Sequence, residues 1–335
     1  MAKRTIKDVK LSVLDLVPAL EGVKHKTAIE NSLSLAQHLD QLEYHRLWIS
    51  EHHNTDGLLS SATVVILGYL LQGTENIRIG SGGIMLPNHA PLVVAEQMGT
   101  LETIYPNRVD LGLGRAPGTD QITAKALRRE RTGSVHDFPK DVQELEFFLS
   151  DYSAESKVRA IPGEGTNVPI YLLGSSTFSA QLAAALGLPY VFASHFAPTY
   201  LFDALDIYRK KFRPAEQIEK PYTMAGVNVV VADTDEEAEY LATSGKQFRL
   251  SIIRNERRPL QPPVKDMEEV WRNPMEKAQV EKMGYYSFVG SPETVKKGLN
   301  GFIEQTKVDE LIISTYCYDQ KAQHRSFELL KELQS

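Results

Sequence analysis

Residues 77–118, IRIGSGGIMLPNHAPLVVAEQMGTLETIYPNRVDLGLGRAPG, contain the pattern that decides the fold. An apolar, glycine-containing run, Ile77–Leu86, is followed by a stretch with helical spacing, Leu92–Tyr105, and then by a second apolar run, Val109–Gly114. Strands with near-continuous apolar sequence are buried on both faces, as they are in parallel sheets whose strands are joined by helices. The stretch therefore predicts a strand–helix–strand unit of a parallel sheet.

The same alternation continues along the chain in both directions. Eight apolar runs that predict strands occur at Leu11–Leu16, Arg46–Ser50, Ile77–Leu86, Val109–Gly114, Ile170–Leu173, Tyr190–Ser194, Met224–Val231 and Glu310–Thr315. Helical spacing occurs at Thr27–Leu42, Ser61–Gln72, Leu92–Tyr105, Asp141–Leu149, Ser179–Leu186, Tyr200–Phe212, Asp235–Leu250 and Pro292–Gln305. Eight strands and eight helices in alternation predict an α/β TIM barrel in a single domain over residues 1–335, with a doubly wound sheet as the alternative.

Two connections are longer than a simple crossover requires. Pro117–Lys140 follows the fourth predicted strand, and Arg254–Tyr286 lies in the seventh strand–helix unit. Long connections in a compact domain often form lids or binding loops. We therefore expect extended loops after strands 4 and 7, near the ligand.

Composition and charge exclude several classes of protein. The 335 residues are 42% hydrophobic and 24% charged, with a formal net charge of -6, so neither a nucleic acid nor an anionic membrane is an expected partner. The most apolar stretch, Leu58–Leu71, is shorter than the roughly 20 residues that span a membrane. Asp15 and Pro18 interrupt the apolar segment near the N-terminus, and the single cysteine, Cys317, has no intrachain disulfide partner. A cytoplasmic location is the expectation.

Glycines and polar residues follow the predicted strands at the edge where barrel enzymes hold their active sites. They are Glu51, His52 and His53 after the second strand, Gly82 and Gly83 within the third, Arg115 after the fourth, Gly174, Ser175 and Ser176 after the fifth, and Ser194 and His195 after the sixth. A ring of small hydrogen-bond donors with an arginine and histidines suits a flat, anionic cofactor.

The turn after the fifth strand predicts a phosphate site. Free amide groups and the positive end of the helix dipole attract anions at a helix start. Ser176 and Ser179 would add hydroxyl donors, and Arg115 from the neighbouring strand would neutralise the charge. A serine that only caps the helix is an equally good interpretation of this turn.

The histidines after the second strand admit two interpretations. Neighbouring side chains of an extended segment point to opposite faces, so either His52 or His53 is expected in the pocket and the other behind it. A histidine there suits acid–base chemistry, although a structural histidine pair fits equally well. A metal site formed by Glu51, His52, His53, His89 and His195 is disfavoured, because the chain has neither an HExxH motif nor a cysteine pair.

The helix predicted at Ser61–Gln72 is apolar on nearly every face. An outer helix of a monomeric barrel normally has one apolar stripe. Either the long loops or a second subunit must cover the remaining apolar surface, and we expect a homodimer.

Three strings together resemble the bacterial luciferase-like, flavin-dependent monooxygenase family: RLWISEHHN at 46–54, the quoted stretch at 77–118, and LLGSSTFSAQLAAALGLPYVFASHF at 172–196. The resemblance extends from about Leu11 to Thr315 and is strongest to small, functionally uncharacterised enterobacterial members of the YhbW type. It implies a TIM-barrel fold, usually dimeric, and reduced FMN or, in some branches, a deazaflavin.

The resemblance also implies roles for individual residues. His52 matches the acid–base histidine beside the flavin, and Glu51 matches a neighbouring pocket residue. Gly82 and Gly83 match a pair joined by a non-proline cis peptide beneath the flavin ring. The positions matched to phosphate contacts and to the backbone near them are Arg115, Ser176, Ser179, Gly174 and Ser175.

By this resemblance, we expect reduced FMN to react with O2 at flavin C4a and to oxygenate a small organic substrate. The sequence has no recognisable nicotinamide site, so we expect a separate flavin reductase to supply the reduced FMN. Gly114 stands where luciferases carry a reactive cysteine, and Ser175 stands where they carry a glutamate. We therefore do not expect aldehyde oxidation or light emission. A non-catalytic flavin-binding or carrier protein and a deazaflavin-dependent oxidoreductase are the alternatives.

Overall fold

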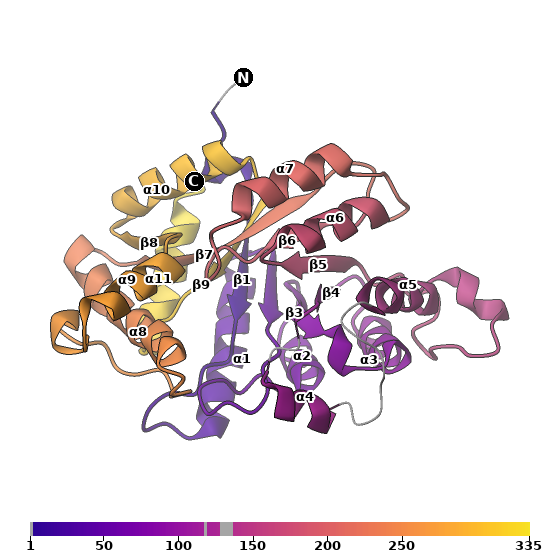
Figure 1. Cartoon of the computed structure of the whole chain (residues 1–335), viewed down its shortest axis with the longest axis horizontal. Helices are drawn as coiled ribbons and strands as arrows, with labels where there is room; N and C mark the ends of the chain where they lie inside the picture. The colour runs from indigo at the N-terminus through magenta and orange to yellow at the C-terminus, as the bar shows by residue number, and fades with distance from the viewer. Residues whose placement is uncertain (1–2, 117–118, 128–136) are drawn as a thin grey trace.

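A closed barrel of eight parallel strands forms the centre of the computed structural model, which describes residues 3–116, 119–127 and 137–335 (Figure 1). The barrel strands are β1 Lys10–Asp15, β2 Arg46–Ile49, β3 Arg78–Met85, β4 Val109–Gly114, β5 Ile170–Gly174, β6 Tyr190–Phe192, β7 Thr223–Val231 and β9 Glu310–Ser314. They pair in the order β6-β5-β4-β3-β2-β1-β9-β7, and the pairing of β6 with β7 closes the ring. The predicted TIM barrel is confirmed, and the doubly wound sheet is wrong.

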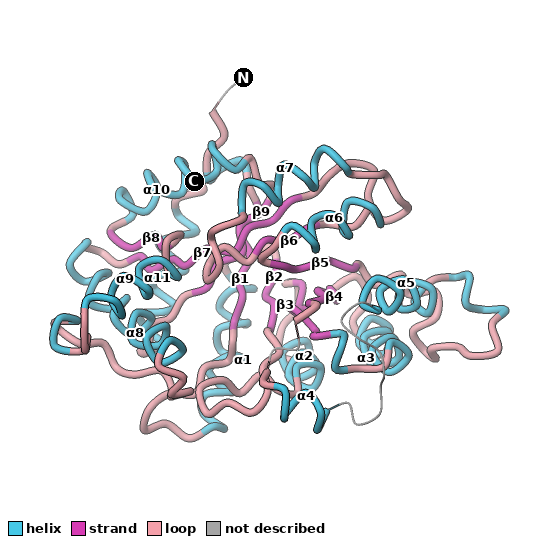
Figure 2. Tube along the Cα trace, in the orientation of Figure 1, coloured by secondary structure: helices cyan, strands magenta, loops and turns pink. Residues whose placement is uncertain are grey.

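Helices surround these strands, which run through the centre of the molecule (Figure 2). Their bounds are α1 His25–Gln41, α2 Thr63–Gln72, α3 Pro91–Ile104, α4 Gln121–Leu127, α5 Phe138–Leu149, α6 Thr177–Leu186, α7 Leu201–Lys211, α8 Asp235–Ile253, α9 Pro274–Met283, α10 Pro292–Thr306 and α11 Gln320–Glu332. All eight predicted helices are present with shifted ends, and α4, α9 and α11 are additional. Both long connections therefore contain a helix, although Pro117, Gly118 and residues 128–136 lie outside the described residues.

A further strand, β8 Ser287–Gly290, lies beside the barrel and was not predicted. It pairs with Asn228–Val231 of β7, whereas Met224–Asn228 of β7 pair with β9. Because β7 is nine residues long, its carboxyl-terminal half extends beyond the ring and provides an edge for β8. The sheet thus widens at β7, and α8 and α9 connect β7 to β8.

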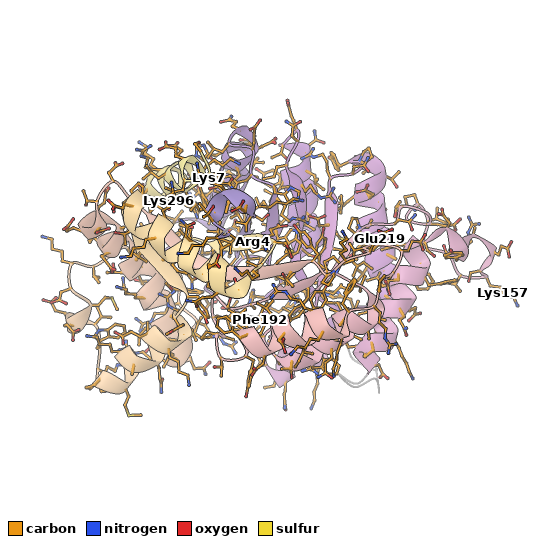
Figure 3. The ribbon with its side chains drawn as sticks, turned by 90° about the horizontal axis from the view of Figure 1, so that it is seen from above. Arg4, Lys7, Lys157, Phe192, Glu219 and Lys296 are labelled. Atoms are coloured by element: carbon orange, nitrogen blue, oxygen red, sulfur yellow. The ribbon has the colours of Figure 1, made fainter. Side chains whose placement is uncertain are left out.

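The barrel interior has an apolar layer and a polar layer. Leu14, Trp48, Tyr171, Val191, Met224 and Ile312 form the apolar layer. In the view from above, Phe192 lies well inside the outline of the molecule, whereas Lys157 projects from its edge (Figure 3). The six side chains of the apolar layer close the barrel beneath the ends of the strands, so that a ligand is held at the mouth and not in a pore.

Charged side chains form the polar layer, at the start of β2, β4 and β9. Nη1 of Arg46 lies 2.8 Å from Oδ2 of Asp110, and Nε of Arg46 lies 2.8 Å from Oε1 of Glu310 as an ion pair. Asp110 also accepts hydrogen bonds from Arg78 and Trp48. Burial alone would raise the pKa of Asp110, but the two guanidinium groups hold it below its usual range. The charges of this layer are paired with one another inside the fold.

The apolar surface of α2 is only partly covered within one chain. Val65 is 73% exposed and Tyr69 is 41% exposed, whereas Leu67 and Leu70 are buried against the barrel. Residues on the outer face of a helix are normally polar. Within the described chain, Val65 and Tyr69 are therefore free to contact a second subunit, and the homodimer stays a prediction. No helix in the described ranges is both long enough and apolar enough to cross a membrane.

Candidate active site

A cavity of about 530 Å³ opens at the carboxyl ends of the strands, a size within the range of small-molecule and cofactor sites. Nine of the eleven predicted site residues line it: His52, Gly82, Gly83, Arg115, Gly174, Ser175, Ser176, Ser179 and His195. They come from the ends of β2 to β6, as expected for a barrel. The two remaining predicted residues, Glu51 and Ser194, do not line it.

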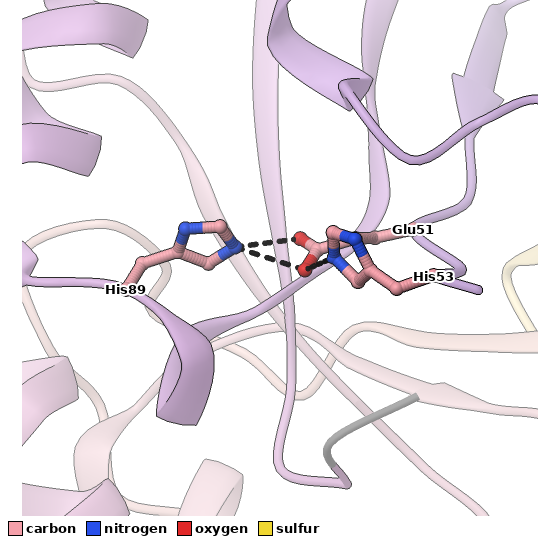
Figure 4. Close-up of side chains that lie close together, drawn as sticks. All are labelled: Glu51, His53 and His89. Carbon is pink, nitrogen blue, oxygen red and sulfur yellow. Dashed lines mark hydrogen bonds and ion pairs between the residues drawn. The ribbon is translucent and has the colours of Figure 1, made fainter. Parts of the chain in front are cut away.

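Glu51 lies behind the cavity wall, which corrects the expectation of a pocket residue. Its side chain is 1% exposed, and its carboxylate accepts hydrogen bonds from Nε2 of His53 at 2.8 Å and from the backbone N–H of Met85 at 3.0 Å. His89 Nε2 lies 2.9 Å from the same carboxylate (Figure 4). Although burial alone would raise the pKa of Glu51, these hydrogen bonds keep it below its usual range. Glu51 is therefore an anionic positioning residue that links the ends of β2 and β3.

Ser194 is also removed from the cavity, because its hydroxyl donates to the carbonyl oxygen of Gly226 at 2.6 Å. Its neighbours Ala193 and His195 line the cavity instead. Adjacent residues at the end of a strand point to opposite sides, so a cavity-facing His195 implies a Ser194 that faces elsewhere. Ser194 holds β6 against β7.

His52 and His195 face the cavity together. Nδ1 of His52 lies 3.0 Å from the hydroxyl of Ser50. Burial lowers the pKa of His52 to about 4. The negative charge of Glu51 opposes this shift, and the electrostatic effect of His53 adds to it. Burial and the nearby His52 lower the pKa of His195 to about 4. Both imidazoles are therefore neutral near pH 7, and each can accept a proton.

Gly82 and Gly83 form the cavity floor and are joined by a cis peptide bond, as the family resemblance implied. A Cβ at Gly82 would lie 2.7 Å from Leu14 Cδ1, and one at Gly83 would lie 2.6 Å from the carbonyl oxygen of Gly112. Neighbouring strands leave no room for a side chain at either position. Packing within the barrel is thus sufficient to require glycine at both positions, whether or not a ligand also lies close to them.

The start of α6 and Arg115 form a polar end of the cavity. Ser176 occupies the N-cap position but its side chain makes no capping hydrogen bond, so the interpretation of a simple cap is not supported. Gly174 is required here, because a Cβ would lie 2.4 Å from Oγ of Ser179. The Arg115 guanidinium lies 4.1 Å from the ring centre of Phe178 and has no carboxylate partner in the described part of the chain. This end offers free donors and a positive charge.

The opposite wall was not predicted. It is lined by Phe248 and Ile252 of α8, by Met283 at the end of α9, and by Tyr316 after β9. Phe248 stacks on Tyr316 with ring centres 5.2 Å apart. Strand order could have indicated Tyr316, which follows β9, but nothing in the helical pattern of α8 shows that its last turns reach the barrel mouth.

The disfavoured metal site is only partly assembled. The ligand atoms of Glu51, His53 and His89 lie within 4.8 Å of one another, a spacing that a metal ion accepts. His52 and His195 do not belong to this group. The nitrogen–oxygen distances within it, 2.8 to 3.0 Å, are those of ordinary hydrogen bonds. The three side chains are therefore joined to one another by hydrogen bonds.

Comparison with known proteins identifies relatives over nearly the whole chain. An uncharacterised protein YvbT from Bacillus subtilis is 48% identical over 334 residues, covering 99% of both chains. A luciferase-like monooxygenase from Escherichia coli is 46% identical and covers 98% of both chains. The N-acetyl-S-alkylcysteine monooxygenase of Bacillus subtilis is 31% identical and covers 97% of this chain and 98% of its own.

Solved structures agree with this result. MsnO8 without ligand has a TM-score of 0.85 and 31% identity, and the match covers 97% of this chain and 98% of that one. The same fold, at 18% identity and a TM-score of 0.71, occurs in the FMN complex of the oxygenating constituent of a 3,6-diketocamphane monooxygenase from Pseudomonas putida. An F420-dependent secondary alcohol dehydrogenase also shares it, at 15% identity and a TM-score of 0.68.

The family model described as luciferase-like monooxygenase matches residues 9–310. This range includes the strands from β1 to β8 and every residue of the polar end of the cavity. The match covers most of the chain, and the relatives above extend it to nearly the full length. The chain belongs to the luciferase-like monooxygenase family.

Proposed function

We propose that the chain is an FMN-dependent monooxygenase that uses reduced FMN and O2 to oxygenate a small organic substrate. The observation that carries the proposal is the unpaired Arg115 beside the uncapped start of α6, in the same cavity as His52. A phosphate is the group that such a combination of free amides, hydroxyls and guanidinium suits best. In this arrangement Arg115, Ser176 and Ser179 hold the phosphate, and Gly82 and Gly83 lie beneath the ring.

Bound reduced flavin would supply the reaction with oxygen, and the protein would control water and protons around it. His52 is neutral near pH 7 and is oriented by Ser50, so it can take up a proton on its cavity-facing nitrogen. Phe248, Ile252 and Met283 give the opposite wall an apolar surface that limits the access of water. Glu51 holds the loop that carries His52 without contacting the ligand.

The proposal also covers the partner protein, the cellular location and the oligomeric state of the enzyme. A separate flavin reductase delivers the reduced cofactor, the protein is cytoplasmic, and the single barrel domain assembles as a homodimer through the exposed face of α2. A particular kinship with the enterobacterial YhbW-type members stays a proposal, since a Bacillus relative is 48% identical and an Escherichia relative is 46% identical.

The deazaflavin-dependent oxidoreductase is the competing function, because one structure with the same fold binds F420. Both cofactors carry a phosphate and a flat ring, so the polar end of the cavity does not separate them. A carrier or store of flavin would use the same cavity without needing His52.

Anaerobic titration of the purified protein with FMN, riboflavin and F420, in oxidised and reduced forms, tests the proposal. We expect reduced FMN to bind most tightly. Arg115→Ala should weaken FMN by roughly 10- to 100-fold and leave riboflavin unchanged, because the substitution removes a charge-assisted contact to phosphate alone. Arg325→Ala, at an exposed arginine paired with Asp233, is the matched control.

Three results would change the assignment. Tighter binding of F420 than of FMN would favour the deazaflavin enzyme. Equal weakening of FMN and riboflavin by Arg115→Ala would remove Arg115 from the phosphate site. Substrate-dependent O2 consumption that survives His52→Ala unchanged would remove His52 from the mechanism, and no substrate-dependent consumption across a broad panel would favour a carrier.

A further inference from the structure

Arg249 on α8 is a half-buried cation that lacks an anionic partner in the described part of the chain. It forms no ion pair and no hydrogen bond within the described ranges, and its Nε is enclosed without an acceptor. Burial lowers the pKa of Arg249, yet an arginine side chain keeps its proton at neutral pH. Enclosing an unpaired guanidinium is costly, so such a group is expected where a ligand supplies the missing charge.

Three strands present further unpaired polar atoms beside it. Asn228 of β7 is in register with Ser314 of β9 on one side and with Ser287 of β8 on the other. Oγ of Ser314, Oδ1 of Asn228 and Oγ of Ser287 are all shielded and without hydrogen-bond partners. Neighbouring strands are about 4.8 Å apart, so the three residues form a row across the strands in which Asn228 separates Ser287 from Ser314.

The row faces the same side as the cavity lining. Gly226 and Ile312 line the cavity, and Asn228 and Ser314 stand two residues further along the same strands. Alternation along a strand places residues i and i+2 on one face. The Nδ2 group of Asn228 also donates to the carbonyl oxygen of His195, which connects the row to a cavity residue.

Arg249 lies over one end of this row. Its Cζ and Nε, and Oγ of Ser287, all lie 3.0 to 3.1 Å from the point that a Cβ would occupy at Gly284. Met283, the preceding residue, and Tyr316 both line the cavity. Gly245, one turn before Arg249 on α8, packs against Tyr316. The guanidinium is thus directly behind the wall that Met283 and Tyr316 form.

We propose that Arg249, with the hydroxyl of Ser287, forms a subsite for the carboxylate of a small organic acid that is the substrate of this enzyme. The hydroxyl and the guanidinium donate to the carboxylate, and Oδ1 of Asn228 accepts an N–H or O–H group of the same molecule. The apolar body of the acid contacts Phe248, Ile252 and Met283. The inference rests on the proposed function only in calling the ligand a substrate.

This subsite differs from the expected phosphate site. Arg115 and α6 follow β4 and β5, whereas the proposed carboxylate subsite belongs to β7, β8 and α8. In the closed ring these strand groups lie across the mouth from each other. A cofactor phosphate at one side and a substrate carboxylate at the other leave the space between them for the flavin ring and the group that is oxidised.

Calorimetric titration with 3-phenylpropionate and its uncharged amide, 3-phenylpropionamide, tests the subsite on the cofactor-free and on the FMN-saturated protein. We expect the wild type to bind the carboxylate at least tenfold more tightly than the amide. Arg249→Met should abolish this preference, and Arg249→Lys should retain part of it. Arg325→Met, at an exposed and paired arginine, should keep the preference in full.

A second variant changes the surroundings of the guanidinium at a residue that is not a proposed ligand contact. Gly284→Ala places a methyl group against Arg249 and Ser287 and should also reduce the preference for the carboxylate. Thermal unfolding of each variant separates a local effect from loss of the fold. Equal binding of the two probes by the wild type, including failure of both, contradicts the proposal, as does a preference that persists in Arg249→Met.

The two proposals fail independently. If FMN does not bind but the carboxylate preference disappears in Arg249→Met, the subsite stands and the cofactor assignment fails. If Arg249→Met leaves the binding of both probes unchanged while FMN binds normally, the carboxylate subsite is wrong and the proposed cofactor stands.

Discussion

Arg46 is buried at the closed end of the barrel, Arg249 on α8 is half-buried near the open end, and the two arginines differ in what surrounds them. Arg46 pairs with Asp110 and Glu310, and Asp110 in turn accepts from Arg78 and Trp48. Arg249 has no ionic partner in the described part of the chain and adjoins the hydroxyl of Ser287, which is also unpaired. The charge of Arg46 is thus balanced within the fold, although its Nε, like that of Arg249, has no hydrogen-bond partner among the described residues.

The difference in charge pairing indicates a structural role for the closed end of the barrel and a binding role for the open end. Charges that are fully paired inside a fold hold strands in one arrangement, although they add little net stability over an apolar core. Unpaired polar groups reduce stability, and they are kept where they serve binding or catalysis. The closed end of this barrel is therefore structural, and the unpaired groups concentrate around the open end.

Breaking the paired cluster should have the largest effect. Asp110→Ala leaves Arg46 and Arg78 with an uncompensated positive charge in the barrel interior, and we expect a loss of about 3–5 kcal/mol in the free energy of unfolding. Urea unfolding followed by far-UV circular dichroism measures it. Asp233→Ala, which breaks an exposed pair with Arg325, is the control and should cost less than about 0.5 kcal/mol. Similar losses in both variants would contradict the structural role of the cluster.

The two ends of the barrel should also respond to different ranges of pH. The folded pKa of Asp110 is below its ordinary value of 3.8, so its stabilising contribution is complete above that pH and is lost as the pH falls further. The folded pKa values of His52 and His195 are about 4 instead of 6.5. Protonation of these histidines favours the unfolded state, so stability should decline between pH 6.5 and pH 4.

Replacing the histidines tests the upper range. In His52→Gln and His195→Gln, we expect the decline in unfolding free energy between pH 6.5 and pH 4 to shrink by about 2 kcal/mol per histidine. Urea unfolding at several pH values across this range measures the slope. The decline below pH 3.8 should remain, because it belongs to Asp110. An unchanged slope above pH 4 would show that the cavity histidines titrate normally.

The barrel was predictable from sequence because its strands are marked by apolar runs. All eight were found, and β4 was predicted with its observed bounds, Val109–Gly114. The four-residue β8 was missed because it pairs only with the extended half of β7, a tertiary feature with no local signal. The helix α11 was missed although Phe327, Leu329 and Leu330 give it a short apolar stripe.

The site was predictable where it follows the ends of strands and not where it depends on tertiary packing. His52, Arg115 and Ser176 were found by position after a strand. Ser194 was assigned to the cavity wrongly, although alternation with a cavity-facing His195 would have corrected it. Arg249 has no such signal, because this helical residue comes to lie behind the cavity wall only through the way α8 packs over β8.

Removing the unpaired cation should have the smallest effect on stability, and with the opposite sign. Arg249→Met keeps the length of the side chain and removes a charge that no group of the fold compensates, so we expect the free energy of unfolding to rise by roughly 1 kcal/mol. Urea unfolding under the conditions used for Asp110→Ala measures it. If Arg249 were a structural residue, the substitution would destabilise the protein instead. A gain in stability together with a loss of carboxylate preference would be the outcome that only a binding role explains, because packing alone does not link the two.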